Sequence, residues 1–345
     1  MPDINAEYRK QFMRKQLSFE KEYREIFNKV ADDFARLSYD PNIKFAKAFI
    51  FPKYIKERMK VMMTDFHDQV LELTKTEIEG FWDLSNQKND KLVTNYLETI
   101  STIKARQQAA YFMPNTSALK AFLSTAHGTE TLSESVWKIA RQYRKELETH
   151  LGIGVAQGDS ADVISRRIRQ YLKNPDALFR RVRDKNGKLV ASKAMSEYHP
   201  GQGVYKSAYK NAMRVTRSET NAAYHLADML RWEQLDMVKG FEIKLSASHV
   251  IFDICDECVG IYPKTFIFTG FHPQCMCNAV PVMSSQQDFL EYLRTGDREV
   301  NNMVTQYPEN FKNYVKDNFE RYSNYKSVPF WITDNKEIIK NIVKK

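Results

Sequence analysis

All four cysteines of this chain lie in the 23-residue stretch CDECVGIYPKTFIFTGFHPQCMC, together with one histidine. Cys255 and Cys258 are separated by two residues, Cys275 and Cys277 by one, and His272 precedes Cys275 by three. Two short pairs of sulfur or nitrogen ligands, joined by a hairpin, are a common way to supply the four ligands of a tetrahedral zinc ion. Five candidates compete for four positions, so the sequence predicts a zinc site without choosing its ligands.

Besides a zinc site, the cysteine cluster could consist of buried thiols without a ligand, or of a disulfide or redox pair. The chain shows no secretory signal and no apolar run of about 18 residues, which favours a reducing compartment in which thiols are first considered as metal or redox groups. A bound zinc is expected to be structural, because no H-E-x-x-H motif and no H-x-E with P-C-x-x-C accompanies the cluster. His249 and Asp253, just upstream, are additional potential ligands.

The elements that must hold this cluster follow from the spacing of the apolar residues. In the N-terminal region, residues 1–132, apolar residues recur at intervals of three and four and predict helices over 19–37, 53–81 and 90–112. The last region, residues 286–345, is helical by the same criterion and ends in the basic sequence EIIKNIVKK.

The central region, residues 133–285, contains both the helical spacing of three and four residues and the alternation of apolar and polar residues that is typical of strands. A long helix is predicted from about 204 to 235, and the alternating segments FEIKLS, TFIFTGF and NAVPVM predict short strands around the cysteines. Pro281 lacks an N–H, which places the last strand at a sheet edge or end. The expected fold is therefore α+β and mostly helical, with a small antiparallel sheet around the Cys/His cluster.

A basic segment precedes the long helix, in a chain whose formal net charge is +9. Ser160 is expected to cap a helix whose arginines face away from its apolar side, and Asn186-Gly187 marks either a hairpin turn or a loop. Such a segment is either a solvated face or a nonspecific contact to the phosphates of double-stranded DNA, since few aromatic residues accompany it. The candidate nucleic-acid-binding residues are Arg166, Arg167, Arg169, Lys173, Arg180, Arg181 and Arg183.

Two motifs together resemble a known family. RVTRSETNAAYHLADMLRW, on the long helix, and FHPQCMCNAVPV, at the end of the cluster, are similar to the paired motifs of the phage Mu protein F-like minor head proteins, the head morphogenesis family. The resemblance covers about residues 137 to 283. In this chain Ser218 stands where the family has threonine, and Met276 stands where it has arginine between the two cysteines.

The resemblance implies a few copies of an accessory protein in the interior of a phage or prophage head, assembled in the host cytoplasm. Its partners would be the portal protein, other head proteins and packaged DNA, and no membrane. The family's helix motif falls on Arg217, Glu219 and Thr220, and its second motif falls on His272, Pro273, Cys275 and Cys277. The implied role is structural, in head assembly, and not catalytic.

Two functions of other classes remain as alternatives. One is a zinc-stabilised nucleic-acid-binding module that acts outside a virion. The other is a toxin-type enzyme such as an ADP-ribosyltransferase, which would require an arginine, a Ser-x-Ser and a Glu-x-Glu in that order. Glu-x-Glu sequences such as those at 77–79 and 146–148 precede Arg217 and the Ser-x-Ser at 246–248, and none follows, so the required order is absent.

Overall fold

The computed structural model describes residues 3–43, 51–98, 100, 105–126, 130–174, 181–191, 207–247, 249–297, 302–325 and 328–344. They are mostly helical, with one three-stranded antiparallel sheet and one two-stranded hairpin, so the predicted α+β class is confirmed. The chain forms two compact units, the first composed of Met1–Gln16, Lys75–Thr131 and Arg217–Lys345, the second of Leu17–Thr74 and Leu132–Thr216. The predicted domain limits at 132/133 and 285/286 stay predictions.

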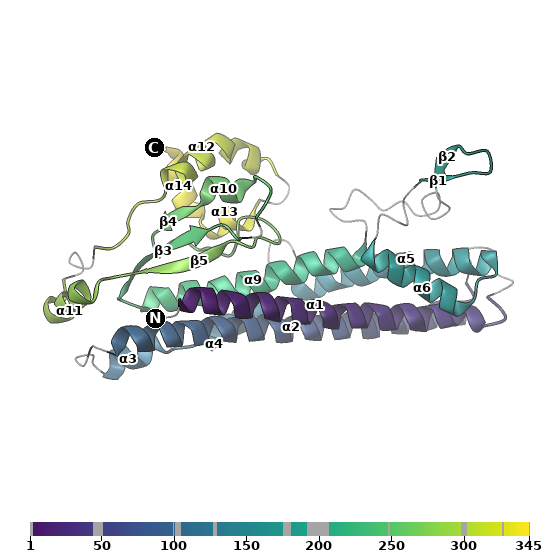
Figure 1. Cartoon of the computed structure of the whole chain (residues 1–345), viewed down its shortest axis with the longest axis horizontal. Helices are drawn as coiled ribbons and strands as arrows, with labels where there is room; N and C mark the ends of the chain where they lie inside the picture. The colour runs from purple at the N-terminus through teal and green to yellow at the C-terminus, as the bar shows by residue number, and fades with distance from the viewer. Residues whose placement is uncertain are drawn as a thin grey trace. The chain divides into compact units, whose positions relative to one another are not determined.

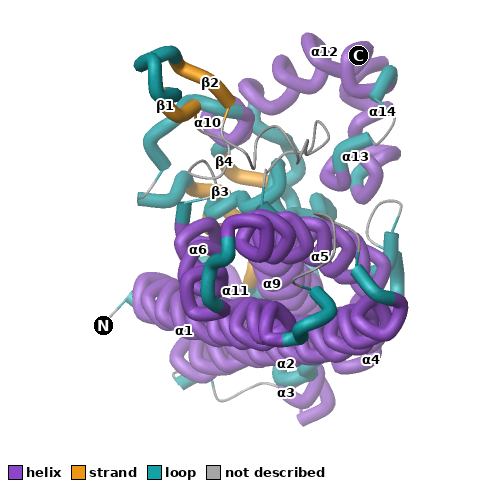
Figure 2. Tube along the Cα trace, turned by 90° about the vertical axis from the view of Figure 1, so that its right-hand side faces the viewer, coloured by secondary structure: helices purple, strands orange, loops and turns teal. Residues whose placement is uncertain are grey.

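The second unit is a helical bundle. It contains α1 (Ile4–Ala35) from Leu17 onward, α2 (Lys53–Leu97) as far as Thr74, and α9 (Ala208–Gln234) as far as Thr216. It also contains the short helix η1 (Arg36–Tyr39), α5 (Leu132–Gln157) and α6 (Ala161–Lys173). In the end-on view of Figure 2, α1, α2, α5 and α6 lie side by side.

Aromatic side chains fill the centre of this bundle. The ring of Phe27 on α1 lies 4.9 Å from that of Phe66 on α2 and 4.6 Å from that of Tyr143 on α5, measured between centroids. All three side chains are buried. Aromatic pairs at such distances add to the stability that apolar burial already supplies.

Helix α6 and the hairpin after it agree with the sequence predictions. The hydroxyl of Ser160 caps α6 by accepting a hydrogen bond from the N–H of Val163, and the apolar side of the helix is buried. Strands β1 (Arg181–Arg183) and β2 (Leu189–Ala191) pair antiparallel across the Asn-Gly turn. Gly187 has a φ of 77°, a conformation that glycine adopts without the cost of a Cβ.

The first unit contains the sheet. Its strand order is β4 (Gly260–Tyr262), β3 (Val238–Lys244) and β5 (Asn278–Met283), all antiparallel neighbours, with α10 (Ile254–Cys258) between β3 and β4 in the chain. Pro281 lies in β5, at an edge of the sheet as predicted. Figure 1 shows the sheet with α10, α12, α13 and α14 gathered beside it.

Helical segments of α1, α2 and α9 complete the first unit, together with α3 (Ala105–Tyr111) and α4 (Thr116–Ser124). The two helices predicted over 53–81 and 90–112 were placed wrongly. Helix α2 continues without a break to Leu97, and α3 is a separate short helix. The polar residues between the predicted helices do not end α2, because several are buried and hydrogen-bonded to α9, as described below.

The strand predicted over TFIFTGF is also wrong. Phe266, Phe268 and Phe271 are buried in the core, but the segment between them is irregular. The side-chain amide of Asn335 takes the place of a neighbouring strand, because its Oδ1 accepts from the N–H of Ile267 and its Nδ2 donates to the Ile267 carbonyl, both at 2.8 Å. The third strand of the sheet is instead β4, in the preceding GIY sequence.

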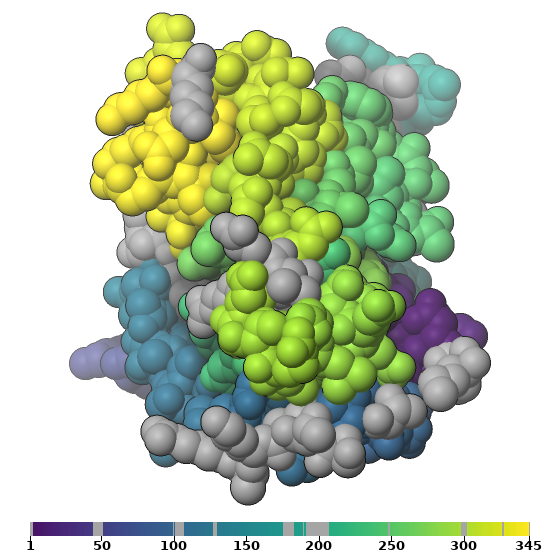
Figure 3. Space-filling model, turned by 90° about the vertical axis from the view of Figure 1, so that its left-hand side faces the viewer, coloured from purple at the N-terminus to yellow at the C-terminus, as the bar shows by residue number. Residues whose placement is uncertain are grey.

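The C-terminal helices pack on the same core. These are α11 (Gln286–Thr295), α12 (Glu309–Ser323), α13 (Phe330–Asp334) and α14 (Lys336–Lys344). The buried ring of Trp331 lies 6.1 Å from those of Phe271 and Phe311 and 5.8 Å from that of Tyr322. In Figure 3 the yellow C-terminal residues lie directly against lime-green residues of the preceding helices. Among the described helices, none has the length and apolar character that crossing a membrane requires.

Candidate functional site

The first two cysteines lie on a short helix that its own N-cap holds in place. Asp253 Oδ1 accepts from the N–H of Cys255 at 2.7 Å, and Asp256 Oδ2 accepts from the N–H of Asp253 at 2.8 Å. This is a capping box, which satisfies N–H groups that the start of a helix leaves without partners. Cys255 and Cys258 are buried as a result.

The other two cysteines follow a tight turn that α9 holds. The N–H of Cys275 donates to the carbonyl of His272 at 3.0 Å, and Gln274 has a φ of 61°, unusual for a residue with a Cβ. Ser218 Oγ accepts from the N–H of Gln274 at 3.0 Å, and Arg217 Nη1 donates to its Oε1 at 3.2 Å. These contacts compensate the cost of the unusual backbone.

Gly270 lets this turn approach closely. Its φ is 113°, and a Cβ built on it would lie 3.1 Å from the Cβ of Cys275. A larger residue would therefore meet both backbone strain and a close contact. His225 of α9 supports the next residues, since its Nε2 lies 3.2 Å from the carbonyl oxygen of Cys277.

Two of the four thiols and the imidazole come together, and a third thiol adjoins them. The Sγ atoms of Cys255 and Cys275 are 3.6 Å apart, and His272 places a ring nitrogen within 4.8 Å of both. Cys277 interacts with both thiols, and a hydrogen bond from Cys255 lowers the pKa of Cys275. Cys258 is not part of this group, and burial raises the pKa of its thiol.

The donor set fits zinc. Zinc–sulfur bonds of about 2.3 Å in tetrahedral geometry place two sulfurs about 3.8 Å apart, close to the 3.6 Å between Cys255 and Cys275. His272 Nε2 lies 3.2 Å from Asp253 Oδ2, the kind of carboxylate–histidine contact that orients metal-binding imidazoles. Its Nδ1 lies 2.9 Å from the carbonyl oxygen of Pro273, a contact that would have to open for Nδ1 to bind an ion. All four cysteines are free thiols. Of the five predicted ligands, Cys255, His272 and Cys275 are the set that the geometry brings together, and Cys277, which interacts with both of these thiols, is the candidate for the fourth position.

An arginine that was not identified from the sequence contacts the same segment. Arg9 Nη2 on α1 donates to the carbonyl of Met276 at 2.5 Å. Burial lowers the pKa of Arg9, and its proximity to Tyr224, and to a smaller extent to Cys277 and Cys275, opposes that shift. Arg9 therefore supplies a cation to the turn that contains Met276.

A hollow of about 220 Å³ opens beside the thiols. His249, Asp253 and Asp256 line or adjoin it and form a second group of potential ligands. His249 Nε2 lies 2.8 Å from Asp256 Oδ2, which raises the pKa of His249. These three residues are only half-buried, and the two carboxylates already accept hydrogen bonds at the helix cap. We therefore assign them to holding the loop and not to binding a metal ion.

The residues of the helix motif differ in their burial. Glu219 is half-buried, whereas Thr220 is fully buried and donates to the carbonyl of Arg217. The fully buried carboxylate of α9 is instead Asp228, which was not identified from the sequence. Pro273 lies in the turn between His272 and Gln274.

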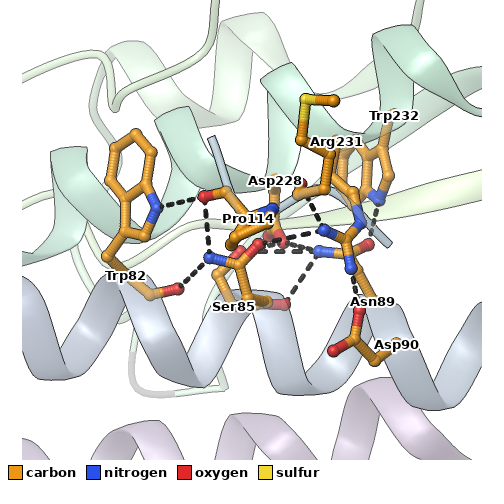
Figure 4. Close-up of polar contacts among 10 residues, drawn as sticks. Trp82, Ser85, Asn89, Asp90, Pro114, Asp228, Arg231 and Trp232 are labelled. Atoms are coloured by element: carbon orange, nitrogen blue, oxygen red, sulfur yellow. Dashed lines mark hydrogen bonds and ion pairs between the residues drawn. The ribbon is translucent and has the colours of Figure 1, made fainter. Parts of the chain in front are cut away.

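Asp228 is the centre of a buried polar network between α2 and α9 (Figure 4). Its Oδ1 accepts from Ser85 at 2.6 Å and from Asn89 at 2.7 Å, and its Oδ2 accepts from Lys88 at 2.5 Å. Burial lowers the pKa of Lys88 and raises that of Asp228, while their mutual attraction opposes both shifts.

Neighbouring residues extend the network in Figure 4. Trp232 Nε1 donates to Asn89 Oδ1 at 2.7 Å, and buried Arg231 forms an ion pair with Asp90. Trp82 Nε1 donates to the carbonyl of Pro114 at 2.9 Å. Because most of these side chains are buried or half-buried, the network fixes the register of α2 against α9, the helix that contacts the cysteine turn through Ser218 and Arg217.

The predicted basic residues separate into groups. Arg166 is exposed, Arg167 forms an ion pair with Asp159, and Arg169 lies 3.5 Å from Asp32. Lys173, at the end of α6, is exposed. Among the hairpin residues, Arg183 is exposed and donates to the carbonyl of Gly187 at 2.7 Å, whereas Arg180 and the side chain of Arg181 lie outside the described residues.

Comparisons of the chain with protein-family models, with curated proteins and with solved structures found no match.

Proposed function

We propose that the chain is a minor head protein of a phage or prophage, with a structural role in head assembly at the portal and beside packaged DNA. The observation that carries the proposal is the contact between the two motifs on which the resemblance rests. Ser218 and Arg217 of the helix motif bind Gln274 of the His-Pro-x-Cys-x-Cys motif, 56 and 57 residues apart in sequence. Two motifs that pair in sequence and also pair in space support one structural element.

The proposed role of the cysteines is to hold this element with one zinc ion. Cys255, His272, Cys275 and Cys277 would bind it, with Asp253 orienting the imidazole. Zinc would link α10 to the turn after Gln274, and so to α9. Four protein ligands would leave no open coordination position, which suits a structural ion better than a catalytic one.

Copurification with the portal protein of the same genome tests the function. We expect the tagged chain to retain that portal protein through purification. The Cys275→Ser/Cys277→Ser variant should lose it, because zinc loss would release the turn from α10. Cys258→Ser is the matched control, since Cys258 is equally buried but outside the thiol group, and it should retain the portal protein. Binding to DNA with no retention of the portal or other head proteins would instead favour a nucleic-acid-binding module outside the virion.

A further inference from the structure

A second hollow, of about 250 Å³, lies within the helical bundle of the second unit. Three helices line it, and the lining contains four cations, Arg24 of α1, Arg169 and Lys173 of α6, and Lys210 of α9. Only the two on α6 were identified from the sequence. The four cations come from three helices, whereas the cations of an ordinary solvated face lie along one helix.

The positive charge of the hollow is only partly neutralised. Arg169 lies 3.5 Å from Asp32, and Asp32 also accepts a hydrogen bond from Ser165. Within the described part of the chain, no carboxylate lies within 4.0 Å of the cationic groups of Arg24, Lys173 or Lys210. Like charges gathered without matching anions repel one another, and an anionic ligand would relieve that repulsion.

Neutral groups give the hollow a defined shape. Leu172 is buried beneath it, and half-buried Asn28 and Tyr209 add an amide and a hydroxyl that can donate hydrogen bonds. The ring of Tyr209 packs against Phe27 at 5.3 Å, and the N–H of Lys210 donates to Ser207 Oγ at 3.2 Å. The ring of Tyr209 and the backbone of Lys210 are therefore held in position before any ligand arrives.

The cations also continue beyond the hollow along α6. Arg166, Arg169 and Lys173 are spaced at three and four residues, so they share one face of the helix. At about 1.5 Å per residue, they span roughly 10 Å. That length corresponds to about three nucleotides of one strand of duplex DNA, at roughly 3.4 Å each. A row of this kind suits a linear polyanion better than a small isolated one.

From these observations we infer that the hollow between α1, α6 and α9 binds backbone phosphates of nucleic acid, with Arg24, Lys173 and Lys210 as its principal cations. The inference deepens the proposed function, from which it takes duplex DNA as the ligand. Recognition is of phosphate and is independent of base sequence, since no aromatic ring other than that of Tyr209 lines the hollow among the described residues.

Anisotropy of a labelled duplex of about 20 base pairs, titrated with the full chain from roughly 50 to 200 mM salt, tests the inference. We expect the Arg24→Gln/Lys173→Gln/Lys210→Gln variant to bind about tenfold or more weakly, with a salt slope shallower by about 2 to 3. The matched control is Lys56→Gln/Arg58→Gln/Lys60→Gln, which removes the same charges from exposed positions of α2 in the same unit. It should change affinity by less than about threefold. Lys173→Arg/Lys210→Arg keeps the cations and should bind like the original chain.

Equal weakening by the two triple variants would overturn the inference, because it would show a general effect of charge. Unchanged binding by the hollow variant would overturn it as well. Binding of inorganic tripolyphosphate distinguishes a site for free phosphates from a site for the phosphates of a nucleic-acid backbone. If the hollow variant lost only tripolyphosphate binding while duplex binding persisted, the hollow would not be a nucleic-acid site.

This experiment is independent of head assembly. A chain that binds DNA through the hollow but does not retain the portal protein would keep the inference and contradict the proposed function. A chain that retains the portal protein but binds DNA equally well without the three cations would support the proposed function and contradict the inference.

Discussion

Arg9 donates a hydrogen bond from its Nη2 to the carbonyl oxygen of Met276, the residue between Cys275 and Cys277, at 2.5 Å. The two residues are 267 positions apart in sequence, so an N-terminal helix contributes directly to the turn that carries two of the proposed zinc ligands. The burial of Arg9 gives this contact a low-dielectric setting, in which a cation interacts more strongly with nearby thiolates.

Arg9→Gln should therefore weaken zinc binding by about tenfold or more, the usual range for loss of an outer partner of a metal site. Competition with a chromophoric zinc chelator measures the affinity. Arg14→Gln, an exposed arginine on the same helix, is the control and should leave the affinity unchanged. Equal zinc affinity in the Arg9 variant and the original chain would show that Arg9 does not contribute to zinc binding.

Zinc content itself is a separate prediction. The purified chain should contain one zinc, and changing Cys275 or Cys277 to serine should remove it and lower the melting temperature, since the binding free energy of a structural ion contributes to folding. Cys258→Ser should retain the ion. Elemental analysis and thermal unfolding give the two readouts, and a chain without stoichiometric metal would falsify the zinc assignment.

The buried pair of Lys88 and Asp228 predicts a large loss of stability. Asp228→Asn leaves the Lys88 ammonium buried without its counter-charge and should lower the free energy of unfolding by about 3 to 5 kcal/mol. Glu219→Gln is the comparison on the same helix, and because Glu219 is half-buried its effect should stay below about 1 kcal/mol. Urea unfolding measures both, and similar losses for the two variants would mean that Asp228 is not the principal carboxylate of α9.

How well the sequence predicted these features depended on the range of the interaction. The Ser160 cap and the edge position of Pro281 depend on neighbouring residues and were predicted, and the Asn-Gly hairpin is one of the two alternatives that the sequence left open. The irregular course of TFIFTGF depends on the amide of Asn335, 68 residues later, and could not be predicted in this way.

The same limit applies to the candidate site. The spacing of Cys255, His272, Cys275 and Cys277 identified a possible ligand set, but the separation of Cys258 from the group required the fold. Lys88 lies in the polar sequence NQKNDK and resembles a solvated face until Asp228 is placed against it. The cations of Arg9, Arg24 and Lys210 were missed for the same reason, since their partners or neighbours come from other helices.

His150 predicts an acid-side loss of stability in the second unit. Burial, and to a smaller extent the charge of Arg167, lowers its pKa to about 4, while the ring of Tyr171 packs at 5.5 Å. A depressed pKa means that only the unfolded chain binds the proton as the pH falls below about 6.5. This contribution to stability is present above pH 6.5 and is lost progressively towards pH 4, by at most about 1.4 kcal/mol per pH unit.

His150→Gln should flatten the pH dependence of the unfolding free energy between those two values, measured by urea titration at several pH values. His272→Gln is a poor comparison because it changes the proposed zinc site, so exposed Lys56→Gln serves as the control. An unchanged slope in the His150 variant would assign the acid sensitivity to other groups.

We propose that this chain is a component of a phage head, and the decisive measurement is the amount of it in purified DNA-filled heads. Quantitative mass spectrometry of heads from the phage or induced prophage that encodes the chain should find a small, constant number of copies per head. The Cys275→Ser/Cys277→Ser variant should be depleted and the Cys258→Ser variant should not. Heads that assemble, fill with DNA and contain none of the chain would contradict the account.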